Sequence, residues 1–149
     1  MIGLLQRVTH AHVVVDGERI AAIESGLMVL VGVERGDGEP QAERLAERLL
    51  GYRVFPDADH KMNLSVTAVD GELLLVPQFT LPADTQKGMR PSLSRAAPPE
   101  PGERLFNTLV AYARSKYPRV QCGRFGAHMA VTLTNDGPVT FTLRVAPNE

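Results

Sequence analysis

The stretch "GLMVLVGV", residues Gly26–Val33, is a continuous apolar run bounded by glycine on one side and by charge on the other. A run of this length without alternation is typical of a strand that is buried on both faces of a sheet. We therefore expect a central strand here, with the rest of the chain arranged around it.

The sequence before this run predicts a β-hairpin. Met1–His12 and Val13–Ile23 are rich in β-forming residues, and Asp16-Gly17 between apolar stretches is a strong turn signal. The N-terminus has no basic stretch ahead of an apolar core and is broken at Gln6-Arg7. It therefore predicts a strand rather than a signal peptide.

The sequence after this run contains two segments with helical spacing. Within Gln41–Arg53, apolar residues recur at i, i+3, i+4, i+7 and i+8, and charges fill the other face. A second helix is expected at about Gly102–Lys116, where Pro118 stops it. Between them, Phe55–Ser65 is expected to be irregular and Glu72–Val76 to be a short strand.

The remaining segments complete the expected fold class. Gly36–Pro40 is expected to be a turn or loop, and Pro82–Pro101, with five of the eleven prolines, a long ordered loop. Strands are expected at Val120–Cys122, Met129–Thr134 and Val139–Val145. The sequence thus predicts an α+β fold with a largely antiparallel or mixed β-sheet and two main helices.

The last two of these strands raise a question. Alternating runs lie on both sides of Asn135-Asp136-Gly137, which predicts a hairpin turn. Pro138 then stands where the second strand would begin, although proline has no N–H to donate to a sheet. Composition and spacing leave this proline unexplained.

Size, charge and cysteine content limit the possible classes of protein. A chain of 149 residues predicts a single domain, 1–149. It contains no run of about 18 apolar residues, so no membrane span is predicted. The net charge of −1 argues against broad nucleic-acid binding, although Lys87–Arg95 carries three basic residues and no acid. Cys122 is the only cysteine, so no intrachain disulfide is possible and a cytoplasmic location is expected.

Familiar catalytic motifs are missing from the sequence. It has no G-x-S-x-G, no G-x-x-x-x-G-K-[ST] and no H-E-x-x-H. His10 and His12 would share one face of a strand but have no obvious third ligand, so we expect no metal there. We expect no organic cofactor either. Cys122 is expected to be a small buried residue. An enzyme with this sequence would use backbone groups or groups of its substrate.

Two segments resemble the signature motifs of the D-aminoacyl-tRNA deacylases, also called D-tyrosyl-tRNA deacylases. They are Pro77-Gln78-Phe79-Thr80-Leu81 and Asn135-Asp136-Gly137-Pro138-Val139-Thr140. The stretches "QRVTHAHVVVDG", "RVFPDADHKMNLSV" and "KGMRPSL" agree with that family in order and spacing. The resemblance covers nearly the whole chain.

This resemblance implies an α+β homodimer that removes D-amino acids, and wrongly attached glycine, from the 3′ end of tRNA. In the family the site lies at the dimer interface. Gly137 and Pro138 match a pair that is joined by a cis peptide bond and reaches into the partner's pocket. Its carbonyl oxygens occupy the space that an L-side chain would need. Arg7 matches a position that supports this motif.

The resemblance assigns the other half of the site to Gln78, Phe79 and Thr80. Their backbone N–H groups would bind and polarise the substrate carbonyl, with help from the terminal ribose 2′-OH. The hydroxyl of Thr80 makes a nucleophile conceivable, but no base is placed beside it in sequence, so a positioning role is expected. The family commonly has serine where this chain has Pro77. Either that serine is dispensable, as we expect, or rate or substrate differs here.

Three further residues are candidates for substrate binding. Lys87 and Arg90 could meet phosphates of the single-stranded tRNA end, and Met129 could line the amino-acid pocket. Two other functions remain open: a hydrolase of another small ester on the same scaffold, and a non-catalytic RNA-binding dimer.

Overall fold

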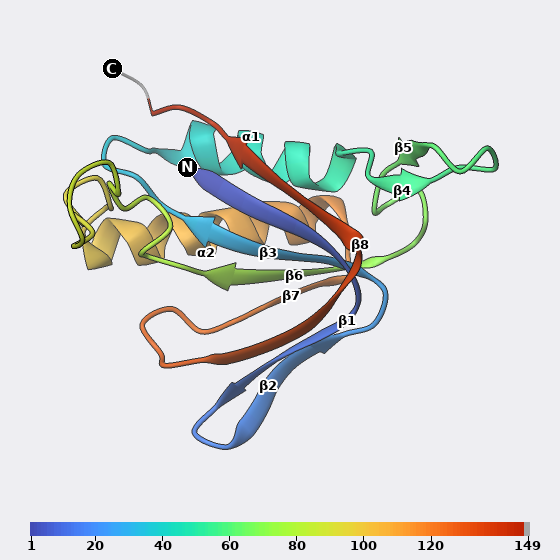
Figure 1. Ribbon diagram of the computed structural model, residues 1–149, viewed down its shortest axis with the longest axis horizontal. Coiled ribbons are helices and arrows are strands. Elements are labelled where there is room, and N and C mark those ends of the chain that lie inside the picture. The colour runs from blue at the N-terminus through green and yellow to red at the C-terminus, as the bar shows by residue number, and fades with distance from the viewer. Residues whose placement is uncertain (148–149) are drawn as a thin grey trace.

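The structure, a computed structural model, describes residues 1–147 and contains a six-stranded mixed sheet with two helices on one face (Figure 1). The order is β2-β1-β3-β6-β7, and β8 pairs with the other edge of β1. Its strands are β1 (Ile2–Val15), β2 (Glu18–Ile23), β3 (Gly26–Gly32), β6 (Glu72–Pro77), β7 (Val120–Cys122) and β8 (Ala130–Arg144). β3 runs antiparallel to β1 and parallel to β6, and β7 is parallel to β6. The predicted α+β class with a mixed sheet is therefore confirmed.

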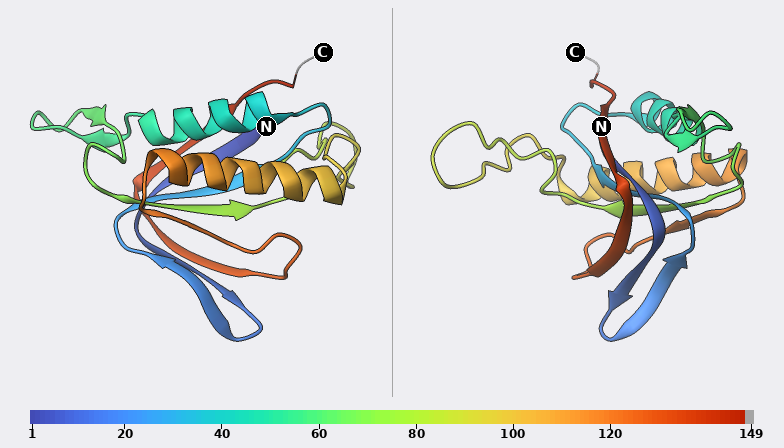
Figure 2. Two further views of the ribbon diagram at one scale, coloured as in Figure 1. Left: turned by 180° about the vertical axis from the view of Figure 1, so that it is seen from behind. Right: turned by 45° about the vertical axis from the view of Figure 1, so that its right-hand side comes forward.

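The central position predicted for the Gly26–Val33 run is also confirmed. Leu27, Val29 and Val31 belong to the core beneath the helices, whereas Met28 belongs to a second core on the opposite face. The first core is covered by α1 (Glu39–Gly51) and α2 (Pro99–Lys116), which lie side by side across the sheet (Figure 2). Neither helix in residues 1–147 is long and apolar enough to cross a membrane.

The second core forms because the sheet curls until β2 approaches β7. The backbone N–H of Ala22 in β2 donates to the side-chain oxygen of Gln121 in β7, at 2.9 Å. The buried side chains enclosed in this way include Val8, Val13, Ile23, Leu74 and Val76. The β1–β2 hairpin that folds over them turns at Asp16 and Gly17, as predicted, and both residues have positive φ.

The helices begin earlier than the sequence indicated. α1 begins at Glu39 instead of Gln41, and α2 at Pro99 instead of Gly102, inside the segment expected to be loop. Proline is tolerated in a first helical turn, where the backbone N–H groups have no partner within the helix. Pro40, Pro99 and Pro101 are therefore helix residues, and Pro98 is the N-cap of α2.

Phe55–Ser65 is more regular than expected. β4 (Phe55–Pro56) and β5 (Met62–Leu64) pair as a separate two-stranded sheet that projects from the end of α1 (Figure 1). The carboxylate of Asp57 accepts hydrogen bonds from the N–H groups of Asp59 and Lys61 and so closes the turn. This short sheet depends on that local side-chain bond, which a polar composition does not reveal.

The prediction of a C-terminal hairpin is wrong, because β8 is a single strand that pairs with β1 along its whole length. Val8 pairs with Asn135 and Gln6 pairs with Thr140, so the four residues Asp136–Val139 lie opposite Arg7 alone. We call this segment the bulge. The alternation on its two sides belongs to one interrupted strand, since β1 provides a continuous edge of 14 residues. Pro138 lies in the bulge, outside the regular pairing, so its missing N–H costs the sheet nothing.

Candidate active site

The first motif forms a turn at the end of β6. The N–H of Gln78 still donates to the carbonyl of Val31 at 2.8 Å, and the N–H of Leu81 returns to the carbonyl of Gln78 at 3.2 Å. Between them, Phe79 and Thr80 are exposed. Within residues 1–147 their two N–H groups have no hydrogen-bond partner. The turn therefore presents two adjacent backbone donors to solvent.

Close packing on β3 holds this turn in place. A Cβ atom at Gly32 would lie 2.8 Å from Cδ of Pro82 and 2.9 Å from Cβ of Leu81, so only glycine allows the approach. The side-chain amide of Gln78 donates to the hydroxyl of Thr80. An amide is not a base that could activate that hydroxyl.

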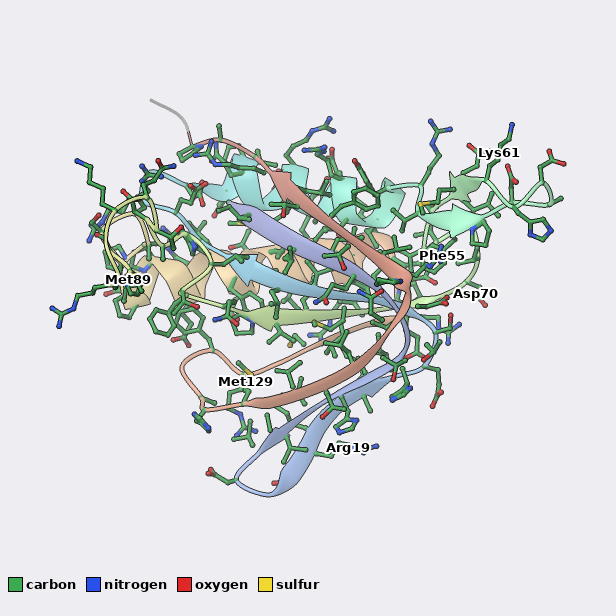
Figure 3. The ribbon with its side chains drawn as sticks, in the orientation of Figure 1. Arg19, Phe55, Lys61, Asp70, Met89 and Met129 are labelled. Carbon is green, nitrogen blue, oxygen red and sulfur yellow. The ribbon has the colours of Figure 1, made fainter. Side chains whose placement is uncertain are left out.

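A cavity of about 500 Å³ opens beside the turn. Its walls are mainly apolar and include Pro77, Phe79, Leu93, Phe125 and Met129, with Arg35 as a charged member. The sulfur of Met129, just before β8 (Figure 3), accepts a hydrogen bond from the N–H of Arg124 at 3.4 Å. Phe79 and Met129 thus meet in one concave site, and a ligand with an apolar part fits its walls.

Lys87 and Arg90 do not line this cavity. The backbones of Asp84 and Ser92 pair with each other and pinch off the intervening residues as a narrow loop. Lys87 and Arg90 are exposed on that loop, on either side of the fully exposed Met89 (Figure 3). These two cations can reach only a ligand that extends beyond the cavity.

Asn135, the residue just before the bulge, holds the two ends of the bulge together through side-chain hydrogen bonds. The side-chain oxygen of Asn135 accepts the N–H of Val139 at 2.7 Å, and its NH₂ group donates to the hydroxyl of Thr140 at 2.8 Å. Gly137 has φ +140°, and a Cβ there would lie 2.6 Å from Cγ2 of Val139. The peptide bond from Gly137 to Pro138 is cis, and both residues are exposed.

Arg7 fastens the bulge to the rest of the molecule. Its Nε donates to the carbonyl of Asp136 at 3.0 Å, and its Nη1 donates to the carbonyl of Val54 at 2.7 Å. The side chain is only 13 % exposed. The sequence pointed to Arg7 only through the resemblance, and it did not reveal the clamp that Asn135 forms, because Asn-Asp-Gly resembled a turn.

One chain does not bring the two motifs together. The bulge lies opposite Arg7, whose partner Leu27 is near the start of β3, whereas Gln78 is bound to Val31 near the end of that strand. Along β3, the four residues from Leu27 to Val31 separate the two motifs by roughly 13 Å. Across the sheet, the three steps from β8 to β1 to β3 to β6 add about 14 Å.

The other candidate residues form no evident centre. Among the described residues, no group of three His, Cys, Asp or Glu side chains is placed to hold a metal ion. His10 lies near the hydroxyl of Thr134, at 3.4 Å. Cys122 is only partly buried, contrary to expectation, because β7 is an edge strand of the sheet.

Comparison with known proteins gives the family directly. The sequence profile described as D-Tyr-tRNA(Tyr) deacylase matches residues 4–144. The D-aminoacyl-tRNA deacylase of Nitrosococcus oceani is 64 % identical over 147 residues, which cover 99 % of this chain and 95 % of that protein. The D-aminoacyl-tRNA deacylase of Methylococcus capsulatus is 58 % identical over 148 residues, covering 99 % and 97 % of the two chains.

Two solved structures share the fold of this chain. One described as c-Myc DNA unwinding element binding protein superposes with a TM-score of 0.93 at 38 % identity, covering 98 % of this chain and 99 % of that one. A probable eukaryotic D-amino acid tRNA deacylase shares the fold, with a TM-score of 0.82 at 16 % identity, covering 95 % and 97 %. The resemblance seen in the two motifs is confirmed, and this chain belongs to the D-Tyr-tRNA(Tyr) deacylase family.

Proposed function

We propose that this protein hydrolyses the ester bond of D-aminoacyl-tRNA, and of glycine wrongly attached to tRNA. The observation that carries the proposal is the pair of free N–H groups at Phe79 and Thr80, beside an apolar cavity, in a chain of this family. Exposed donors of this kind are what a reacting ester carbonyl requires.

The chemistry follows from these donors. Water adds to the ester carbonyl carbon, and the carbonyl oxygen gains negative charge that the two N–H groups stabilise. The bond to the ribose oxygen then breaks, that oxygen takes up a proton, and free amino acid and tRNA are released. The proton that the attacking water loses passes to the leaving ribose oxygen by way of the neighbouring ribose 2′-OH, the role that the family resemblance implies for that hydroxyl. No metal or organic cofactor takes part.

Selection between D- and L-substrates requires a second copy of the chain in this proposal. The bulge and the Phe79–Thr80 turn are too far apart in one chain to contact the same amino acid. In a homodimer the exposed bulge of one subunit enters the site of the other, and the carbonyl oxygens of Gly137 and Pro138 fill the space of an L-side chain. Glycine passes because it has no side chain. Arg7 and Asn135 keep the bulge in shape.

The remaining candidates bind other parts of the substrate. Met129 forms a wall for the amino acid. Lys87 and Arg90, on their exposed loop, contact phosphates of the single-stranded tRNA end, which presents mainly backbone charge to a protein.

Release of amino acid from three substrates tests the activity: D-tyrosyl-tRNA, L-tyrosyl-tRNA and D-tyrosine ethyl ester. We expect turnover of the first alone. Cleavage of the ethyl ester without the tRNA ester would instead indicate a small-ester hydrolase. Tight tRNA binding without turnover would indicate an RNA-binding dimer, and equal rates on D- and L-tyrosyl-tRNA would exclude selection by the bulge.

A mixing experiment tests whether the bulge acts on its partner. Gly137→Ala alters the bulge and should admit L-tyrosyl-tRNA, whereas Phe79→Pro removes one donor and keeps the bulge. In a mixed dimer, the competent site of the Gly137→Ala chain faces an intact bulge. Excess Phe79→Pro protein should therefore suppress L-cleavage by Gly137→Ala protein and leave D-cleavage. Unchanged L-cleavage, or a protein that sediments as an active monomer, would contradict the two-copy site.

A further inference from the structure

Arg35 lies at the cavity but has no part in the proposed function so far. It lies three residues after the end of β3, lines the cavity with Phe79 and Leu93, and is exposed. Its Nε donates to the carbonyl of Ser94 at 2.7 Å, which orients the side chain across the gap between the two segments. Within residues 1–147 it forms no ion pair, so its charge is available to a ligand.

The backbone around Arg35 is firmly anchored. Its own N–H donates to the carbonyl of Arg95 at 2.9 Å. Glu34, just before it, binds Arg144 and the ammonium group of Met1, and the buried carboxylate of Asp37 accepts from that same ammonium and from the N–H of Glu34. Arg35 therefore projects from an anchored backbone, and little backbone order must be gained when it binds a ligand.

The cavity offers an anion no competing negative charge. Arg35 is the one charged side chain among its described lining residues. Pro98 and Pro99, at the start of α2, form part of the wall and add no charge to it. Glu100, the acid in the first turn of α2, faces a separate groove with Glu103 and Asn107. Apolar walls with one cation at the rim suit a flat apolar group that carries a phosphate.

We propose that Arg35 binds the phosphate on the 5′ side of the terminal nucleoside of the tRNA, and so positions the ester at the Phe79–Thr80 donors. This rests on the proposed function. It differs from the roles given to Lys87 and Arg90, which lie outside the cavity and can meet only phosphates farther along the strand. A substrate with one phosphate should therefore depend on Arg35 and not on those two residues.

Binding of adenosine 5′-monophosphate and of adenosine, measured by calorimetry, tests the phosphate contact without catalysis. Wild-type protein should bind the monophosphate about tenfold more tightly, since a charge-assisted contact is worth about 1.4 kcal/mol or more. Arg35→Gln should remove this preference, Arg35→Lys should keep part of it, and Arg44→Gln, an exposed residue of α1, should leave it unchanged. Equal binding of both probes by wild type, or equal weakening of both by Arg35→Gln, would overturn the proposal.

Kinetics with two minimal substrates tests the positioning role. These are 3′-O-D-tyrosyl-adenosine with and without a 5′-phosphate. Arg35→Gln should raise KM for the phosphorylated ester about tenfold, leave its kcat unchanged, and leave the ester without phosphate unaffected. An equal loss on both substrates would contradict the role. If wild type cleaved neither ester nor the tRNA substrate, the proposed function would fail, while the monophosphate measurement would still decide whether Arg35 binds phosphate.

Discussion

The turn at Gln78–Leu81 and the bulge at Asp136–Val139 are built in opposite ways. In the turn, main-chain bonds and packing on Gly32 fix the backbone and leave two N–H groups free. In the bulge, the side chains of Arg7 and Asn135 bind the backbone directly. N–H groups that bind a substrate must have no partner within the protein, whereas a segment that excludes a substrate by its shape must be held in one conformation. The difference therefore matches the roles proposed for the two segments, and three changes test it.

The largest effect is expected from Phe79→Pro. Phe79 is the second residue of a four-residue turn, a position where proline is accommodated, so the change mainly removes the N–H. Loss of one such donor typically lowers kcat by about 100-fold. Phe79→Ala is the control, because it removes the ring and keeps the donor. If both variants lose the same activity in deacylation assays, the ring and not the N–H matters.

Arg7→Ala should lower the free energy of unfolding by about 2 kcal/mol, because the carbonyls of Asp136 and Val54 lose a charged donor. It should also raise cleavage of L-tyrosyl-tRNA relative to D-tyrosyl-tRNA. Chemical denaturation gives the first quantity, and paired deacylation assays give the second. Arg44→Ala, at an exposed helix pair, should change stability by less than about 0.5 kcal/mol. Unchanged selectivity in a folded Arg7→Ala protein would separate the clamp from discrimination.

Asn135→Ala should destabilise the fold by about 1 kcal/mol, since the N–H of Val139 and the hydroxyl of Thr140 lose their partner. Asn135→Asp keeps the acceptor for Val139 and loses only the donor, so it should cost less. Thermal unfolding of both variants provides the measurement. Equal losses would show that the bond to Val139 does not hold the bulge.

The smallest effect concerns acid stability at the buried ammonium group of Met1, outside both segments. Burial raises the pKa of Glu34, but hydrogen bonds from Arg144 and the Met1 ammonium outweigh it and hold that pKa below the ordinary value of 4.5. The unfolded chain then binds more protons, so this contribution to stability is lost as pH falls below about 4.5. Burial raises the pKa of Asp37 above 3.8, despite its bond to the same ammonium, and works in the opposite direction.

Glu34→Gln should therefore flatten the fall in unfolding free energy between pH 5 and pH 3, as measured by denaturation at several pH values. Glu43→Gln, an exposed residue of α1, is the control. If the unfolding free energy falls as steeply with pH in Glu34→Gln as in wild type, other carboxylates cause the loss of stability in acid.

The sequence predicted the parts of the fold that depend on local pattern. The run Gly26–Val33 gave the central strand, and helical spacing gave both helices apart from their first turns and the end of α1, which is Gly51 and not Arg53. The C-terminal hairpin was predicted wrongly because Asn-Asp-Gly has the same composition in a turn and in a bulge. The pairing of β8 with the whole of β1 shows that the segment is a bulge and not a turn. That pairing joins the two ends of the chain, so no local pattern reveals it.

The candidate site was predictable only through the resemblance of the two motifs. No local pattern marks free N–H groups, which depend on where β6 ends. Arg35 gave no signal, because a single arginine in a polar turn usually lies in solvent. The distance between the motifs in one chain follows from strand order, which sequence spacing does not give.

The bulge has a further consequence for how the molecule behaves among its copies. β8 pairs with β1 on one side, and in the described part of the chain no strand covers its other side. A row of open backbone groups 15 residues long invites other chains to add as strands and aggregate. Asp136–Val139 break that row near its middle, and Pro138 removes one donor from it. The same four residues that are proposed to exclude L-substrates thus also interrupt an open edge of the sheet.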